Sequence, residues 1–488
     1  MRGRTTRLAV TVLAAVSLLG AACSKSEQGG GTTGTDQAAN LPPCPLDALD
    51  KATGPVEVTI WHFLQAKTRD ALEQIANEYN ASQSKVKVRV ENQGSDNDEL
   101  WRKYQAGVKA KDLPGISILD DTVTQQIVDS GTVLPATSCI KADGYDMSDF
   151  LPTGQAYYTI DGVLYPASLS LSGALLYYNK NHLRRAGLDP EKAPGTLDEV
   201  REWARKIKAA GVVDKPVVLQ VSPAIIEMFL TGAGAPLVNN DNGRGTGKTD
   251  ASAYDNPTTV SLYQWVREMI DEGLMEALPQ TPGQVGQYLA MANQKASMTI
   301  ETSTAATSVE AFLKGDLNTR GLPADVDPGA VDLQALDIGA AKVPGIKEPG
   351  RLAMGGGAWY IANTNPPEVQ AGAWDFMKYF NSLESQVTWN LVGSYLPYRM
   401  SAAKDARIVD NWTNTRAGRW LAIAYDELLT GVDPKFPGPL IGPYDQVRQA
   451  IRKSVDEVIF NNGQAQPTVT KASDDITALL QQYQKEGF

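Results

Sequence analysis

Alternating strand and helix patterns between residues 56 and 120 constrain the fold of this chain most. Val56, Val58 and Ile60 alternate with polar residues, which is the two-residue period of a half-buried strand. Apolar residues within 68–80 follow the 3.6-residue period of an amphipathic helix. The same patterns continue as a strand at 86–90, a helix at 99–109 and a strand at 115–119. This order predicts a mostly parallel sheet with helices on both of its faces.

Polar and aromatic residues stand where these strands end. Trp61 follows the first strand, and Asp120 and Asp121 follow the third. Ligands of parallel sheets bind beyond the carboxyl ends of the strands, so all three residues are candidate ligand contacts. Two other interpretations stay open at this point. The aspartates could serve only to cap the next helix, and Trp61 could pack beneath the site.

The rest of the chain continues the α/β pattern. Strands are predicted at 173–178, 297–300, 336–339 and 356–362, and helices dominate 257–314 and the region from residue 370 onward. No segment behind the N-terminal apolar run reaches the roughly 18 apolar residues that a membrane helix needs. The length is typical of a globular α/β protein with two or three domains.

The N-terminus has the pattern of a secretory signal. Arginines within the first seven residues precede an apolar run over 8–19, and Gly20-Ala21-Ala22 supplies small residues directly before Cys23. This arrangement resembles the lipobox of bacterial lipoproteins, which implies a signal peptide at 1–22 and acylation of Cys23. The protein would then be exported and held on the extracytoplasmic face of the cell membrane by its lipid anchor alone. An ordinary signal peptide with an incidental cysteine is the alternative.

The segment behind Cys23 predicts a flexible tether over residues 23–52. Residues 24–40 are rich in Gly and Thr and nearly free of apolar side chains. Such a stretch cannot bury enough surface to offset its ordering entropy. A tether behind an acylated cysteine would let the folded part work at a distance from the membrane.

Charge and motif content exclude several classes of function. The chain has a net charge of −11, and removal of the signal arginines makes it more acidic. This argues against a nucleic-acid partner and against embedding in an anionic membrane surface. His62 and His182 are the only histidines of the sequence, and no G-x-S-x-G elbow occurs. We therefore predict no catalytic residue, no metal and no cofactor.

Two short motifs are similar to ligand-binding loops but are incomplete. Residues 243–249 read Gly-Arg-Gly-Thr-Gly-Lys-Thr, yet Asn242 stands where a P-loop needs its first glycine. Residues 240–243 read Asn-Asp-Asn-Gly without the acidic spacing and closing Glu of a Ca²⁺ loop. Both motifs are therefore interpreted as one solvated turn.

Two cysteines remain once Cys23 is assigned to lipid. Cys44 and Cys139 form an even pair in an oxidising compartment, which predicts a disulfide. A loop of about 95 residues closed in this way would stabilise the fold by roughly 4–5 kcal/mol in the loop-entropy model. Two buried free thiols are the alternative.

Residues 55–470 resemble the family 1 extracellular solute-binding proteins of ABC importers, of the maltose- and glycerophosphodiester-binding type. The motifs that carry the resemblance keep the order and spacing of that family. They are Trp61, Leu113 to Asp120, Leu164-Tyr165-Pro166, Leu176 to Lys180, Ala296 to Ile300, Gly355-Gly356-Gly357 and Gly393 to Arg399.

The resemblance implies an α/β, two-lobed periplasmic-binding-protein fold of type II, with parallel-rich sheets flanked by helices and a three-segment hinge. Lobe one would be 53–170 plus 343–396, and lobe two 171–342 plus 397–488. The chain would cross between the lobes near 170–172, 343–345 and 395–399. The protein would act as a monomer beside the permease subunits of an ABC importer.

The resemblance also implies which residues line a pocket between the lobes. A sugar site needs flat aromatic surfaces and polar groups that pair with hydroxyls. Tyr395 and Trp359 are the aromatic candidates, although Trp359 could face the core instead. The full set of implied ligand contacts is Asp120, Asp121, Ser172, Ser303, Thr304, Gly356, Gly357, Trp359, Tyr395 and Trp61.

The predicted function is capture of a carbohydrate and its delivery to the permease. The glycerophosphodiester branch of the family places an Arg near 442–446, where this chain has Gln446, with Arg448 close by. A neutral mono- or oligosaccharide is therefore favoured over a phosphate ligand. A glycerophosphodiester or polyol binder, an extracellular sugar-active enzyme and a receptor lipoprotein are the alternatives.

Overall fold

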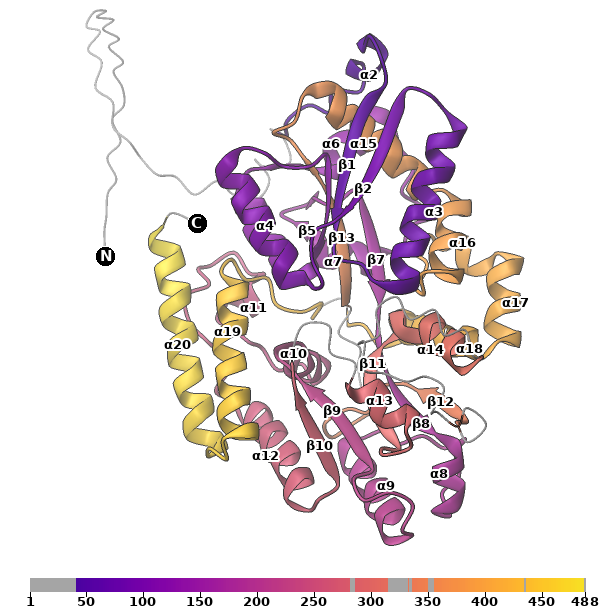
Figure 1. The fold of residues 1–488 in the computed structure, drawn as a ribbon. Coiled ribbons are helices and arrows are strands. Elements are labelled where there is room, and N and C mark those ends of the chain that lie inside the picture. The colour runs from indigo at the N-terminus through magenta and orange to yellow at the C-terminus, as the bar shows by residue number, and fades with distance from the viewer. Residues whose placement is uncertain are drawn as a thin grey trace, which may run out of the picture.

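The computed structural model describes residues 41–280, 286–314, 332, 336–349, 355–433 and 436–486. The predicted signal peptide, Cys23 and the tether up to residue 40 lie outside these residues. Within the described part, no helix combines the length and the apolar character needed to cross a bilayer. Figure 1 shows two α/β bodies, one above the other, with the N-terminal elements in the upper one.

The upper body is built, in its described residues, on a six-stranded sheet. Its strands are β1 (Val56–His62), β2 (Val86–Asn92), β3 (Ile116–Asp120), β4 (Val133–Leu134), β7 (Ser168–Ser172) and β13 (Gly355–Ala362). The strand order is β2-β1-β3-β13-β4, and β7 pairs with β13. β1 runs parallel to β2 and β3, whereas β13 runs antiparallel to β3, β4 and β7. The βαβαβ unit predicted for 56–120 is therefore confirmed, and it is part of a mixed sheet.

The lower body is built on a second sheet of five described strands. They are β8 (Ala174–Asn179), β9 (Val217–Val221), β10 (Met275–Pro279), β11 (Met298–Thr302) and β12 (Ile338–Ala341). β9 runs parallel to β10 and β11, and β8 runs antiparallel to β11 and β12. β5 (Thr159–Ile160) and β6 (Val163–Leu164) form a separate small hairpin. The predicted architecture of two lobes flanked by helices is confirmed, with both sheets mixed.

Helices pack on the upper sheet through their apolar faces. α3 (Ala66–Ser82) buries Leu72 and Ile75 and contacts β2, while α15 (Pro367–Phe380) packs against β1. α4 (Asn97–Ala110) contacts β3 and begins at Asp96, whose carboxylate accepts from the Glu99 amide and so caps the helix. The other helices of this part are α2 (Ala48–Lys51), α5 (Thr124–Asp129), α6 (Ala136–Asp143), α7 (Pro152–Tyr158), α16 (Leu383–Leu391) and the 3₁₀ turn η1 (Asp121–Val123).

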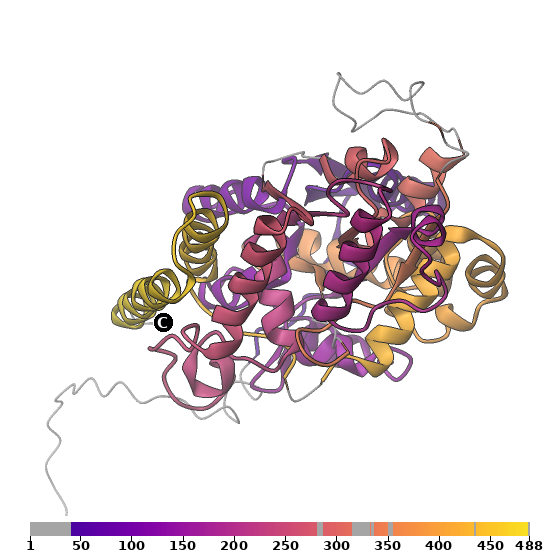
Figure 2. The ribbon, with the colours of Figure 1, turned by 90° about the horizontal axis from the view of Figure 1, so that it is seen from below.

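The lower sheet is surrounded by later helices. α19 (Tyr444–Val455) and α20 (Ala465–Lys485) lie along one side of the molecule, opposite α17 (Ala406–Asn414) and α18 (Arg416–Thr430), as Figures 1 and 2 show. α18 packs against β8 and β12. The remaining elements are α8 (Lys180–Arg185), α9 (Leu197–Ala209), α10 (Pro223–Gly232), α11 (Asn239–Gly243), α12 (Pro257–Asp271), α13 (Gly286–Ala292), α14 (Ala306–Leu313), η2 (Ser303–Ala305), η5 (Ala402–Lys404) and the π-helical turn η6 (Asp456–Phe460).

The chain passes from the upper to the lower sheet at Gly173. β7 ends at Ser172 in the upper sheet, and β8 starts at Ala174 in the lower sheet. Residues 342–354 lead back from β12 to β13. A third segment touches this region where the Leu396 amide donates to the Leu171 carbonyl. These are the three places where the resemblance puts hinge segments, and the exact lobe boundaries stay a prediction.

A disulfide ties the N-terminal end of the described chain to α6. Cys44 and Cys139 are bonded with an S–S distance of 1.98 Å and a separation of 95 residues. The Cys139 side chain is fully buried, and Cys44 packs against the same apolar cluster. The predicted pairing is confirmed, and the alternative of two free thiols is wrong.

Candidate functional site

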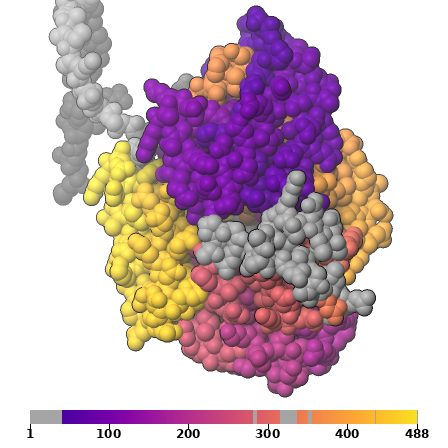
Figure 3. Space-filling model, viewed as in Figure 1, coloured from indigo at the N-terminus to yellow at the C-terminus, as the bar shows by residue number. Residues whose placement is uncertain are grey.

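The two bodies meet in a cluster of charged side chains at the end of β3, of which Glu227 is buried and Arg448 and Asp120 are half-buried. Arg448, on α19, lies between Glu227 of α10 and Asp120, the last residue of β3. Its guanidinium makes three contacts of 2.7–3.1 Å with the Glu227 carboxylate, and its Nη1 lies 3.4 Å from Asp120 Oδ1. Figure 3 shows α19 and α20, in yellow, flanking both bodies. Arg448 therefore connects elements of the lower body to the carboxyl end of β3 in the upper sheet.

Asp120 is held as an ionised carboxylate. Its Oδ1 accepts from the Thr122 hydroxyl at 2.6 Å and its Oδ2 from Asn97 Nδ2 at 2.7 Å. Burial alone would raise the pKa of Asp120, but the charge of Arg448 and these local hydrogen bonds outweigh it and lower the pKa. The carboxylate also accepts from the Thr122 amide, so Asp120 caps η1 as well as facing Arg448. Both interpretations of Asp120, helix cap and site residue, are thus compatible with its position.

Asp121 behaves differently from its neighbour. Burial and the negative charge of Asp120 raise the pKa of Asp121 well above its ordinary value. The shift favours the protonated form of Asp121, which hydrogen-bonds to Asp120. The sequence suggested a charged acceptor here, whereas the raised pKa favours a carboxyl group that can both donate and accept.

Glu227 and Arg448 are the site residues that the sequence reasoning missed or left aside. Glu227 is 6% exposed, and burial raises its pKa although the charge of Arg448 opposes this. Burial also opposes the charge of Arg448, but Glu227 and Asp120 raise the pKa of Arg448 well above its ordinary value, so it stays a cation. Gln446, the residue compared with a family Arg, is exposed. The one local signal for Glu227 was a single acidic residue in the apolar run of α10.

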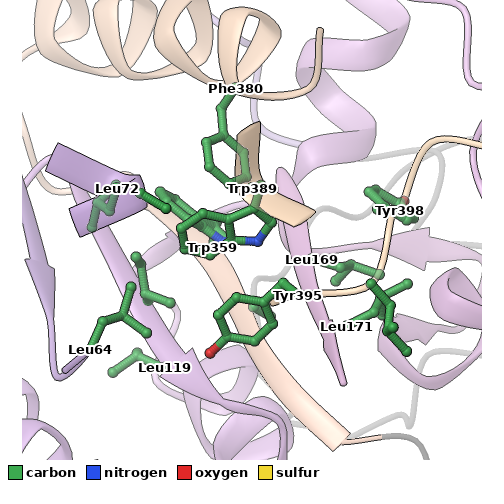
Figure 4. Packing of buried hydrophobic residues seen from close by; sticks show 14 of the residues in the cluster. Leu64, Leu72, Leu119, Leu169, Leu171, Trp359, Phe380, Trp389, Tyr395 and Tyr398 are labelled. Atoms are coloured by element: carbon green, nitrogen blue, oxygen red, sulfur yellow. The ribbon is translucent and has the colours of Figure 1, made fainter. Parts of the chain in front are cut away.

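Tyr395 lies beside this cluster with one ring face covered. Its ring stacks on Trp389 with centroids 4.8 Å apart and planes at 10°, and the residue is 6% exposed. Figure 4 shows its hydroxyl pointing away from Trp389 and Phe380. Burial, and to a lesser extent the charge of Asp120, raises the pKa of Tyr395. Tyr395 thus offers a hydroxyl and a ring edge, instead of the open stacking face that was expected.

Trp359 is a core residue, which corrects its prediction as a ligand contact. It is fully buried, its ring lies 4.1 Å from that of Phe380, and its Nε1 donates to Ser170 Oγ at 2.9 Å (Figure 4). β13 is covered on both sides at this point, so alternation along the strand does not bring a side chain to the cleft.

The glycines at the start of β13 allow close backbone packing beside the site. Gly356 has φ 134°, and a Cβ on it would lie 1.8 Å from the Ser170 carbonyl oxygen. Gly357 pairs with Asp120 across the sheet, and Gly355 pairs with Ser172, which is 8% exposed. Gly356, Gly357 and Ser172 therefore lie close to the end of β3, where they were predicted. Their roles as ligand contacts remain predictions.

Ser303, Thr304 and Trp61 take mainly structural places. Ser303 is fully buried, accepts from the Gly173 amide at 3.3 Å and donates its own amide to the Gly173 carbonyl. Thr304 is half-buried and bonds Thr302. Trp61 is half-buried against the upper core, opposite Ser117 of β3. Their roles as ligand contacts remain predictions, and Ser303 has the least free surface of the three.

The glycine-rich turn at 240–249 borders a cavity near the C-terminal helix α20. A cavity of about 360 Å³ lies between α5, this turn and α20 and is lined by residues that include Asp129, Arg244 and Tyr483. The turn is held by Asn240, whose amide nitrogen donates to the carbonyls of Gly245 and Gly247. Asn240 and the next two residues have positive φ. The turn is thus closed by its own side chain, without the geometry of a phosphate-binding P-loop.

Comparison with known proteins adds to this geometry. Residues 74–416 match a family model described as bacterial extracellular solute-binding protein. The sn-glycerol-3-phosphate-binding periplasmic protein UgpB of Pectobacterium atrosepticum is 22% identical over 441 residues, which cover 89% of this chain and 93% of that protein.

Solved structures are similar along nearly their whole length. The cyclic alpha-maltosyl-1,6-maltose binding protein from Arthrobacter globiformis superimposes with a TM-score of 0.67 at 22% identity, covering 88% of this chain and 100% of that one. UgpB from Mycobacterium tuberculosis in complex with glycerophosphocholine gives a TM-score of 0.68 at 19% identity, covering 89% and 100%. The two bodies thus form the two-lobed periplasmic-binding-protein fold.

Proposed function

Because the chain belongs to the bacterial extracellular solute-binding proteins, a family of transport components and not of enzymes, we propose that it is the binding subunit of an ABC importer and captures a carbohydrate between its two lobes. In this proposal, the ligand favours the closed arrangement because it touches both lobes, and closure presents the loaded protein to the permease.

The observation that carries the proposal is the polar cluster between the lobes. Asp120, Asp121 and Glu227 bring three carboxyl groups to one place, and the Tyr395 hydroxyl lies beside them. Carboxylates are strong acceptors for hydroxyl groups, and the raised pKa of Asp121 favours a form that can also donate. Such a mixture of acceptors and donors suits the hydroxyl edges of sugar rings.

A glycerophosphodiester is the second candidate ligand. One named relative binds sn-glycerol-3-phosphate, and one similar structure holds glycerophosphocholine. Arg448, a cation beside the cluster, is the observation in this chain that favours it. The carbohydrate remains our preferred class because carboxyl groups outnumber this cation among the residues of the cluster.

We also propose the lipoprotein anchor. The signal at 1–22, Cys23 and the polar segment that follows it up to residue 40 support attachment to the membrane by acylation, whereas residues 44–52 of the predicted tether pack on the fold through Cys44 and α2. The Cys23→Ala variant should leave the membrane fraction and be recovered in the soluble exported fraction. A variant that still sediments with membranes would show that Cys23 is not the anchor.

Binding can be tested on the purified mature protein. Thermal shift and calorimetry with maltose, longer maltooligosaccharides, polyols, sn-glycerol-3-phosphate and glycerophosphocholine would identify the class. A ligand at 100 times its Kd should stabilise the protein by about 2.7 kcal/mol. We expect saturable binding of a neutral carbohydrate without turnover. Binding confined to the phosphate compounds would reject the carbohydrate and leave the second candidate.

A further inference from the structure

We propose that Glu227 determines ligand specificity, because it occupies the hydrogen-bonding edge of Arg448 and so keeps phosphate-bearing ligands out of the cleft. This inference rests on the proposed function for the location of the ligand between the lobes. It goes beyond it by assigning to one buried carboxylate the choice between neutral and phosphorylated solutes.

The geometry of the pair carries the first step. Arg448 Nε lies 3.1 Å from Glu227 Oε1 and 3.0 Å from Oε2, and Arg448 Nη2 lies 2.7 Å from Oε2. An arginine recognises phosphate through parallel N–H groups on one edge of its guanidinium. In this protein that edge already faces a carboxylate. The remaining Nη1 is directed to Asp120, at 3.4 Å.

Burial makes the pair difficult to open. The Glu227 side chain is 7% exposed, and its helix is otherwise largely apolar, with Ile226, Phe229 and Leu230 buried on the same segment. Glu227 therefore has little room to turn toward water when another anion arrives. A phosphate that took its place would leave a buried carboxylate without its cation, which is strongly unfavourable.

The surrounding charges act in the same direction. Asp120 stands on the other side of Arg448, with its carboxylate 3.4 Å from Nη1. Arg244 contacts a different set of groups: it covers the Tyr157 ring at 4.6 Å and donates through Nε and Nη1 to the carbonyls of Gly438 and Tyr157. A phosphate that approached Arg448 would thus meet the carboxylates of Glu227 and Asp120 on either side of a cation that is already paired.

Removal of the Glu227 charge should allow the site to bind phosphate-bearing solutes. Glu227→Gln keeps the size of the side chain and one oxygen acceptor but removes the negative charge from the Nε and Nη2 edge of Arg448, whose other charged partner is Asp120 at 3.4 Å. Calorimetry at constant pH and ionic strength would compare glycerophosphocholine, inorganic phosphate and a maltooligosaccharide. We expect no measurable binding of glycerophosphocholine to the wild-type protein and at least a tenfold gain in affinity in the variant. The gain should disappear in the double variant Glu227→Gln/Arg448→Gln.

Glu272→Gln is the matched control. Glu272 binds Arg205 through two contacts, of 2.8 and 3.0 Å, on an exposed helix pair away from the cleft. The Glu272→Gln variant removes the same charge from an Arg–Glu pair. Because this pair lies away from the cleft, the variant should gain no phosphate binding.

The proposal is overturned if wild-type protein binds glycerophosphocholine tightly, a result that does not depend on the folding of any variant. It is also overturned if folded Glu227→Gln, or Glu227→Ala should the first variant unfold, gains no phosphate binding. Failure of the wild-type protein to bind any neutral carbohydrate would instead reject the proposed ligand class.

Discussion

The hydroxyl of Tyr483, near the end of α20, donates a 2.5 Å hydrogen bond to the Asp129 carboxylate at the end of α5. This bond joins the C-terminal helix of the lower body to a helix that follows β3 in the upper body. It accompanies the contact between Arg448 and Asp120, which spans the same junction. The lobes are thus held together by polar contacts at more than one place.

Tyr483→Phe should weaken this arrangement of the lobes. Loss of one hydrogen bond to a carboxylate costs about 1.5 kcal/mol, so ligand affinity should fall about tenfold if the bound state keeps this contact. Calorimetry with the identified ligand measures the change. Tyr79→Phe is the matched control, because Tyr79 makes a similar 2.7 Å bond to Asp375 within the upper body. Equal affinities of both variants and wild type would show that the Tyr483 bond does not influence closure.

The disulfide should stabilise the fold without affecting the site. Replacement of both Cys44 and Cys139 by Ser reopens a loop of 95 residues and should lower the free energy of unfolding by roughly 4–5 kcal/mol in the loop-entropy model. Denaturant unfolding gives this difference, and ligand affinity measured under native conditions should stay the same. A large loss of affinity in a folded variant would mean that α6 positions the cleft.

Local periodicity explains what could be predicted from the sequence. The strands β1 and β2 and the helices α3 and α4 have one apolar face each, so their residue spacing indicates both their type and their order. β13 is different, because six of its eight residues are buried and alternation carries no information there. For this reason the family resemblance predicted Trp359 as a ligand contact, whereas the structure shows it buried in the core.

Contacts between distant residues explain what could not be predicted. Glu227 and Arg448 are separated by 221 positions, and neither belongs to a motif whose spacing would point to the other. The raised pKa of Asp121 depends on its burial and on Asp120, which no pattern of residues reveals. The end of β3 was therefore identified as part of the site, while the charge balance of the site was not.

Ligand binding should tolerate an amide in place of the Asp121 carboxyl group but not the loss of the polar group altogether. A protonated carboxyl and an amide both donate and accept, so Asp121→Asn should keep ligand affinity within about twofold. Asp121→Ala removes both functions and should weaken binding by roughly 1–2 kcal/mol, as for loss of a buried hydrogen-bonding group. Calorimetry on both variants decides this. A severe loss in Asp121→Asn would indicate that the ligand needs an ionised carboxylate at this position.

Glu427 of α18 should make stability depend on pH. The side chain is 1% exposed, nearby Lys342 pairs with Asp426 instead, and burial raises the pKa of Glu427 to about 8. Above the pKa of the unfolded chain, about 4.3, and up to about 8, the folded state keeps a proton that the unfolded state has lost. This residue therefore lowers the free energy of unfolding by up to about 1.4 kcal/mol per pH unit as pH rises through the window.

Glu427→Gln should remove that dependence. Its melting temperature should exceed that of wild type most at pH 8.5, and the gap should narrow toward pH 4.5. Glu78→Gln, on the exposed face of α3, provides the control and should show no such trend. A gap that is constant from pH 4.5 to pH 8.5 would mean that Glu427 is ionised in the folded protein throughout this range.

Gly356→Ala should disrupt the pairing of β13 with β7 next to the crossing at Gly173. Gly356 has φ 134°, which side chains disfavour, and a Cβ would meet the Ser170 carbonyl oxygen at 1.8 Å. The two strands would have to separate, at a cost of roughly 2–4 kcal/mol in the free energy of unfolding. Gly355→Ala is the matched control, because its Cβ would lie 3.7 Å from Ser172 Oγ, an ordinary contact. Denaturant unfolding of both variants measures the difference, and equal stabilities would show that β13 shifts without loss to accommodate the methyl group.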